Sequence, residues 1–232
     1  MIAADIARIA TLGAPVLCLD TCSILDIMRD PTRESVQAHE GAAALQLLSA
    51  LEAGPRLTCL VADQVLLEFD EYSAEILQET ENGLKKFLGN VARVQSVIAA
   101  FGGSGSIELS HFTAHSSRSK AVVDRIMAAA QRAPQHPEIA SRALLRVNQA
   151  RTPARKGKES MKDCVVIETY LDTVTALRAA GLRSKIVFAS SNTKEYVGPL
   201  GGPLKADIGQ EFANLGIEYA PNLAAAKHSL GL

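Results

Sequence analysis

The sequence contains no tryptophan, and aromatic residues make up only 4% of its 232 residues. A module that binds nucleic acid by stacking many bases needs more aromatic side chains, so we do not expect one here. The formal net charge at pH 7 is −1, which excludes strong electrostatic steering of the whole molecule toward nucleic acid. Recognition of a polyanion therefore depends on a local basic patch.

Long hydrophobic runs are also missing. The longest stretch without a charged side chain covers residues 94–107, which is 14 residues interrupted by glycine and serine. A membrane-spanning helix needs about 20 apolar residues. Near the N-terminus, Asp5 and Arg8 stand where a signal peptide would be apolar. These absences predict a cytoplasmic protein that does not contact a membrane.

Paired cysteines are absent as well. The four cysteines form no Cys-x-x-Cys pair, and each lies in an apolar segment: Cys18, Cys22, Cys59 and Cys164. We interpret them as free, buried thiols of a protein in a reducing compartment. A zinc site at Cys18 and Cys22 is disfavoured because no histidine or third cysteine lies nearby in the sequence.

The chain does contain a regular alternation of short apolar runs and longer helical patterns. The apolar runs predict strands at residues 16–20, 56–62, 185–191 and 216–220. The helical patterns cover residues 34–53, 64–100, 160–181, 205–215 and 222–230. This order predicts a single α/β domain over residues 1–232, with a parallel sheet covered on both faces.

The middle of the chain departs from this alternation. We interpret residues 70–150 as a helical insertion or extension, so that the sheet comes from the two ends of the chain. Asn82-Gly83 predicts a break in the first helix of this region, and residues 115–150 predict two helices with a hinge near Ala133-Pro134. A basic loop at residues 151–160 follows.

Acidic residues follow the predicted strands. Asp20 closes the first strand, Glu68 lies early in the helix after the second, and Asp163 lies near the start of the helix after the basic loop. Each alone has a structural explanation, such as capping a helix or favouring its dipole. Together they converge on the carboxyl edge of a parallel sheet, where ligands bind in such folds. Clustered carboxylates favour Mg²⁺ or Mn²⁺. Zinc is disfavoured because no histidine is suitably placed to bind it.

Four segments carry a resemblance to a known family: VLCLDTCSILD, VADQVLLEF, MKDCVVIETYL and IVFASSNTKEY. They resemble the PIN-domain nucleases, which include the toxin ribonucleases of toxin–antitoxin pairs. The segment DIGQEFANLGIEYAPNLAAA is similar to the tail of larger, standalone PIN-like proteins. The resemblance implies a three-layer α/β/α fold with a central parallel sheet, and it implies metal ligands at Asp20, Glu68 and Asp163.

The resemblance also implies roles for the surrounding residues. The fourth acidic position of the family falls at Asn192, with Glu195 nearby. Because an amide brings no charge, we favour one metal ion, or a second ion recruited with the substrate. Hydroxyls expected to orient a ligand or a water belong to Thr21, Ser23 and Ser191, with turn or cap hydrogen bonding as the alternative. Side chains expected to contact phosphates are Lys162, Lys194, Arg155, Lys156 and Lys158, although the basic loop is also explained as a solvated connector.

The implied function is an endoribonuclease in which the metal activates a water that attacks the scissile phosphate. RNA is the expected substrate and DNA the second choice. An antitoxin protein and a second copy of the chain are further candidate partners. The main alternative is a catalytically silent PIN-like scaffold that binds RNA or protein.

Two further enzyme classes rank below these. A haloacid-dehalogenase phosphatase needs a second aspartate where this chain has Cys22, and a nucleotide-binding α/β protein needs a glycine-rich loop after the first strand.

Several other residues invite a functional interpretation, but the sequence favours structural ones. We expect Phe69, Phe87 and Phe188 to lie in the core rather than to stack on bases. Glu168 is expected to be a helix-face or salt-bridge residue. His111 and His115 have the spacing of a metal-binding pair on a helix, but no third ligand is evident, so we expect surface residues.

Overall fold

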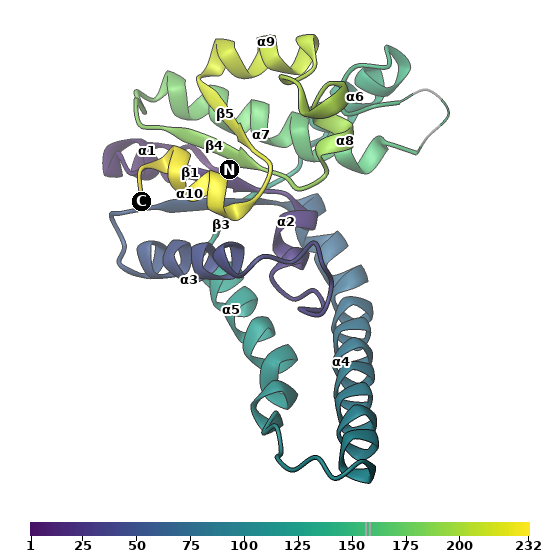
Figure 1. Cartoon of the computed structure of the whole chain (residues 1–232). Coiled ribbons are helices and arrows are strands. Elements are labelled where there is room, and N and C mark those ends of the chain that lie inside the picture. Colours follow the sequence, from purple (N-terminus) through teal and green to yellow (C-terminus); the bar gives the residue numbers. More distant parts are fainter. Residues whose placement is uncertain (156, 158) are drawn as a thin grey trace.

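The computed structural model describes residues 1–155, 157 and 159–232. Its centre is a five-stranded parallel sheet with the order β3-β2-β1-β4-β5 (Figure 1). The strands are β1 (Val16–Leu19), β2 (Thr58–Ala62), β3 (Gln131–Ala133), β4 (Ile186–Ala189) and β5 (Ile217–Ala220). The chain is therefore an α/β protein, as the alternation of segments predicts.

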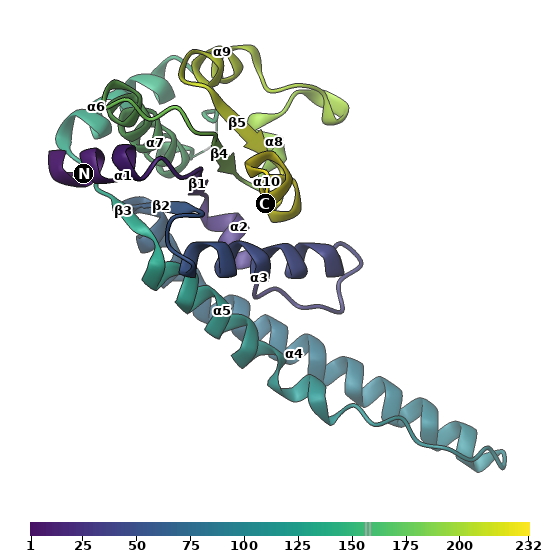
Figure 2. The same cartoon turned by 90° about the vertical axis from the view of Figure 1, so that its left-hand side faces the viewer.

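Helices cover both faces of this sheet (Figure 2). One face carries α1 (Ala3–Leu12), α7 (Met161–Ala179) and α9 (Ala206–Leu215), with α6 (Pro137–Asn148) packed against α7. The other carries α3 (Ala38–Glu52), α5 (His115–Ala129) and α10 (Leu223–Leu230). Because both faces are covered, β1, β2 and β4 are buried at every position, which explains their unbroken apolar sequences.

The four predicted strands are confirmed, but the sheet has a fifth strand that the sequence analysis missed. β3 forms in the region that we interpreted as a hinge near Ala133-Pro134, and it pairs in parallel with β2. Its sequence, Gln-Arg-Ala, is short and polar because β3 is an edge strand. The sheet therefore does not come from the two ends of the chain alone.

The longest helix, α4 (Asp63–Ala100), runs for 38 residues without interruption. The predicted break at Asn82-Gly83 is wrong. Gly83 lies inside the helix, and a Cβ atom there would stand 1.9 Å from the Asp30 carboxylate. The glycine is thus explained by the close approach of Asp30, which lies in the loop between α2 (Thr21–Asp26) and α3.

The outer part of α4 and α5 form a hairpin that projects from the α/β body (Figures 1 and 2). At about 1.5 Å per residue, α4 spans about 57 Å. The short 3-10 helix η1 (Ser110–Ala114) leads into α5. Residues 70–150 are therefore not wholly helical: they hold most of α4, η1, α5 and α6, and also the edge strand β3.

The remaining short elements lie at the carboxyl edge of the sheet or beyond it. They are α2, α8 (Thr193–Tyr196) and the 3-10 helix η2 (Pro199–Gly201). All four cysteines are free, as predicted; Cys22 is half-buried and the other three are buried. In the described part of the chain, no helix combines the length and the apolar character required to cross a bilayer.

Candidate active site

The strand order places a topological switch between β1 and β4. The chain moves outward from β1 to β2 and β3, then returns to β4 on the opposite side of β1. In open α/β sheets, ligands bind in the crevice at the carboxyl ends of the strands beside such a switch. Asp20 follows β1 directly and Ser190 follows β4. The geometry of the sheet therefore marks these two residues as the centre of a candidate site.

Asp20 is buried and fixed by hydrogen bonds. Its Oδ1 accepts from the Thr21 backbone N–H at 2.8 Å, which caps the start of α2. Its Oδ2 accepts from the Ser190 hydroxyl at 2.6 Å and from the Cys22 thiol at 3.2 Å. Burial raises the pKa of Asp20, although these three donors act in the opposite direction.

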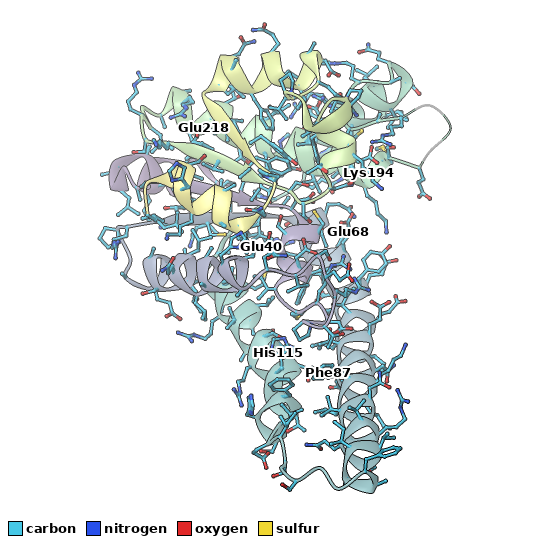
Figure 3. The ribbon with its side chains drawn as sticks, in the orientation of Figure 1. Glu40, Glu68, Phe87, His115, Lys194 and Glu218 are labelled. Carbon is cyan, nitrogen blue, oxygen red and sulfur yellow. The ribbon has the colours of Figure 1, made fainter. Side chains whose placement is uncertain are left out.

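Glu68 reaches the same place from the second turn of α4, where that helix meets the α/β body (Figure 3). Its Oε2 accepts a hydrogen bond from the Thr21 hydroxyl at 2.6 Å, so one residue connects Asp20 and Glu68. Its Oε1 accepts from the Gln64 amide at 3.0 Å. Thr21, predicted to orient a ligand or a water, donates its hydroxyl to Glu68, and the orienting role stays a prediction.

Asp163 lies in the first turn of α7 and completes the group. Its pKa is raised from 3.8 to about 7, first by burial and then by the charges of Asp20, Glu68 and Glu195. Among the described residues, no hydrogen-bond donor contacts its carboxylate to offset these effects. Asp20, Glu68 and Glu195 thus all lie near enough to Asp163 to raise its pKa.

Glu195 and Asn192 flank this group from α8. Arg155 Nε lies 2.7 Å from Glu195 Oε2, but the two are not aligned as a hydrogen bond, and that oxygen is buried without a hydrogen-bond partner among the described residues. Asn192 stands at the start of α8, and its side chain does not cap the helix. Its backbone N–H donates to the Ser190 hydroxyl at 3.3 Å.

The fit of a divalent ion to this group depends on its donors and their spacing. Carboxylate oxygens are the ligands that Mg²⁺ and Mn²⁺ prefer, and a cation would offset the mutual repulsion of these four acids. In the part of the chain that the structure describes, however, no three His, Cys, Asp or Glu side chains stand close enough to hold an ion. The chemistry of the donors fits a metal, and the side chains must move together to bind one.

The predicted phosphate-binding residues are arranged less uniformly. Lys162 pairs with Glu71 at 2.8 Å, and its ammonium lies 5.6 Å from the centre of the Tyr72 ring, so it faces α4. Lys194 is exposed on α8 (Figure 3). Arg155 is partly exposed, and its guanidinium contacts the Glu195 carboxylate. The remaining two, Lys156 and Lys158, lie outside the described residues.

The other two predicted hydroxyls differ from Thr21. Ser23 is buried, and its hydroxyl has no hydrogen-bond partner among the described residues. Ser191 is half-buried at the end of β4. Both line a cavity of about 400 Å³ that extends from this edge toward the hairpin.

Sequence reasoning missed several residues that shape the site. Ser190 and Cys22 both donate to Asp20, and burial followed by the charge of Asp20 raises the pKa of Cys22 to about 12, which keeps the thiol protonated. The Tyr170 hydroxyl donates to the Leu19 carbonyl at 2.5 Å and accepts from the Ala62 N–H at 3.1 Å. It thereby joins α7 to the ends of β1 and β2. Only the position of Ser190 directly after a strand could have indicated its role.

Among the structural interpretations, most hold. Phe69 and Phe188 are buried. Glu168 is a salt-bridge residue, paired with Arg142 at 3.1 Å and with the buried Arg146 at 2.7 Å. The expectation for Phe87 is wrong because its side chain lies on the hairpin and is 38% exposed.

No family model, no curated protein and no solved structure matches the chain.

Proposed function

We propose that the chain is a metal-dependent endonuclease of the PIN-like type and that RNA is its substrate. One observation carries the proposal: Asp20, Glu68 and Glu195, from three other segments of the chain, all raise the pKa of Asp163 at the carboxyl edge of the sheet. Such an arrangement is unfavourable unless a cation or a substrate uses it. The position beside the topological switch supports the same conclusion.

The residues of the site have separate tasks in this mechanism. Asp20 is held rigidly by Thr21, Cys22 and Ser190, so it provides a fixed oxygen at the end of β1. Glu68 and Asp163 approach it from two helices. Mg²⁺ or Mn²⁺ held by these carboxylates would neutralise charge on the scissile phosphate and make a bound water more acidic.

The reaction needs no nucleophile from the protein. A water oxygen would form the new bond to phosphorus while the bond from phosphorus to the 3′ oxygen breaks. The attacking water would give its proton to solvent or to a carboxylate that does not hold the ion, and the departing 3′ oxygen would take a proton from solvent. The products are a 5′-phosphate and a 3′-hydroxyl.

A second candidate function is a catalytically silent module that binds RNA or protein. The observation in its favour is that two of the acids already have partners: Glu68 accepts two hydrogen bonds and Glu195 lies beside Arg155. Asn192 also brings no charge to the site. An antitoxin protein would be a partner for either function.

Cleavage of labelled single-stranded RNA by metal-stripped protein tests the proposal. Mg²⁺ or Mn²⁺ is added back, with EDTA as the control, and the wild type is compared with Asp20→Asn and Asp163→Asn. Asp124→Asn is a matched control, because Asp124 is an exposed acid on α5 that pairs with Lys120. We expect metal-dependent cleavage by the wild type and the control variant, and loss of cleavage in both site variants.

Calorimetry of Mn²⁺ binding gives a readout that does not depend on cleavage. If RNA and single-stranded DNA both stay intact and no metal binds, the nuclease proposal is wrong and the silent module takes its place. If metal binds at the site and only DNA is cleaved, the site is correct and RNA is the wrong substrate.

A further inference from the structure

A second hollow lies at the base of the hairpin, away from the acidic group. It encloses about 440 Å³ between the outer part of α4, η1, the start of α5 and the loop after α2. The side chains that matter here are Phe87, His111, Phe112, His115 and Arg118, with Pro31 from the loop. A hollow of this size is suitable for a small organic ligand or for one unit of a polymer.

Its lining combines aromatic rings with cationic or neutral nitrogen groups. Phe87 and Phe112 stack with ring centres 6.0 Å apart and an angle of 21° between the rings, and His111 meets Phe112 edge-on at 4.4 Å. The Arg118 guanidinium is exposed and donates to the His111 carbonyl at 3.3 Å. No carboxylate belongs to the described lining of this hollow.

The hairpin around the hollow carries charges of both signs. Asp30 lies against Gly83, Glu81 accepts a hydrogen bond from the Ser116 hydroxyl at 3.3 Å, and Glu108 interacts with His111. Between Glu81 and Glu108 the chain has no acidic residue, and it carries Lys85, Lys86 and Arg93 there. The whole chain has a net charge of −1, so this segment is a local basic region on a nearly neutral molecule. The contact with an anion therefore rests on Arg118, which belongs to the lining itself, and not on the outer cations.

The hollow also has a route to the acidic group. The cavity of about 400 Å³ described above is lined by Ser23 and Ser191 at one end, and by Pro31 and His115 at the other. Pro31 and His115 line the hairpin hollow as well. The two cavities are therefore neighbours, and together they connect the carboxyl edge of the sheet with the base of the hairpin.

We propose that the hollow at the base of the hairpin binds one nucleotide unit, with its base against Phe87 and Phe112 and its phosphate near Arg118. Aromatic side chains accept any base by stacking, and arginine binds phosphate oxygens with two parallel hydrogen bonds. The nucleotide is either part of an RNA strand that continues to the acidic group or a free nucleotide. The strand form rests on the proposed nuclease function, whereas the free form does not.

Binding measurements in EDTA test this site without cleavage. The probes are a short dye-labelled single-stranded RNA, followed by fluorescence anisotropy, and adenosine 5′-monophosphate, followed by calorimetry. We expect Phe112→Ala and Arg118→Ala each to weaken binding at least about fivefold. Loss of a phosphate contact by Arg118→Ala also reduces the salt dependence of RNA binding by roughly one counterion.

Two matched controls separate this site from the general character of the hairpin. Phe101→Ala removes an aromatic ring at the tip that is 89% exposed, and Arg93→Ala removes a cation of the outer helix. Both should bind the probes within about twofold of the wild type. Phe112→Tyr keeps a ring and should bind like the wild type, which separates stacking from a folding defect.

Each outcome decides one point. Weaker binding of a probe by the two site variants, and not by the controls, supports the site. Binding of the monophosphate then identifies a free nucleotide as the ligand, whereas binding of RNA alone identifies a strand. Equal weakening by site and control variants, or no weakening, overturns the proposal. Because these assays involve no cleavage, they separate the two proposals. If the wild type cleaves neither RNA nor DNA and binds no metal, the nuclease proposal is wrong, and binding of the monophosphate at the hollow still supports the free form of this one.

Discussion

Asp163→Asn should make the protein more stable at neutral and alkaline pH. The carboxyl group has a pKa of about 7 in the folded protein and an ordinary value of 3.8. The folded state therefore holds a proton that the unfolded state releases between these two values. The ionisation of Asp163 therefore costs no stability below about pH 4, costs progressively more as the pH rises through this interval, and has its full cost above about pH 7.

The size of the effect follows from the same two values. Each pKa unit corresponds to about 1.4 kcal/mol, so complete ionisation of Asp163 lowers the free energy of unfolding by about 4 kcal/mol. Asparagine has nearly the shape of the protonated acid but cannot ionise. For a chain of this length, 4 kcal/mol corresponds to a change in melting temperature of roughly 8–16 °C.

Thermal melts of the wild type and Asp163→Asn across this pH range measure the effect. We expect near-identical melting temperatures at about pH 4, and a clear advantage for the variant at about pH 8. Asp172→Asn on the same helix is the matched control with the opposite sign. Burial raises the pKa of Asp172, but His136 and Arg142 lower it by more, so the net pKa lies below its ordinary value. Asp172→Asn should therefore be less stable than the wild type at high pH.

Two results would refute this reasoning. A variant that is no more stable than the wild type at about pH 8 would mean that the Asp163 carboxylate is not repelled in the folded protein. An advantage of equal size at low and high pH would mean that the substitution acts through packing and not through charge. Added Mn²⁺ should raise the melting temperature of the wild type more than that of the variant, because only the wild type keeps the ligand.

Two further predictions concern residues away from the site. Arg146→Met should cost about 1–3 kcal/mol of unfolding free energy in urea melts, because the buried Glu168 and the half-buried Glu211 lose their shared partner and keep only Arg142 and Arg151; a loss below about 1 kcal/mol would contradict this. Gly83→Ala should stabilise the protein by about 0.5–1 kcal/mol only when Asp30 is also replaced by alanine, because the new Cβ meets the Asp30 carboxylate in the wild type. Equal effects of Gly83→Ala in the two backgrounds would rule out that contact.

The parts of the fold that were predictable are those whose sequence pattern is local. β1 and β4 are apolar throughout, and a buried parallel strand needs nothing else. β3 could not be found because its three residues become a strand only through pairing with β2. Gly83 was misinterpreted for a similar reason: its cause is Asp30, which lies more than fifty residues earlier in the chain.

The candidate site divides in the same way. Asp20, Glu68 and Asp163 were identifiable because chain order and strand position bring them to one edge of the sheet. The donors that fix Asp20 were not, because Ser190 reaches it from a strand that is adjacent only in the folded sheet. Phe87 was predicted to lie in the core because the sequence around it does not show that the second half of α4 projects from the α/β body.

Two groups of acids lie along α7, one around the buried Glu168 and one around the half-buried Asp163, and their surroundings differ. Glu168 faces Arg146, a guanidinium that is 1% exposed and also holds Glu211 at 2.9 Å. One turn earlier, Asp163 faces three acids, and the adjacent cation Lys162 points to Glu71 instead.

A buried arginine, Arg146, neutralises Glu168 and Glu211, and a similar cation could neutralise the acids around Asp163. The repulsion at Asp163 costs stability that the network at Arg146 helps to offset, because that network fixes α6 against α7 and also binds the Thr152 carbonyl at the start of the basic loop. In the proposed function, a permanent protein cation beside Asp163 would occupy the place of the divalent ion and the phosphate. Among the described residues no cation contacts Asp163, and this is what the proposal requires of a site that binds its cation from solution.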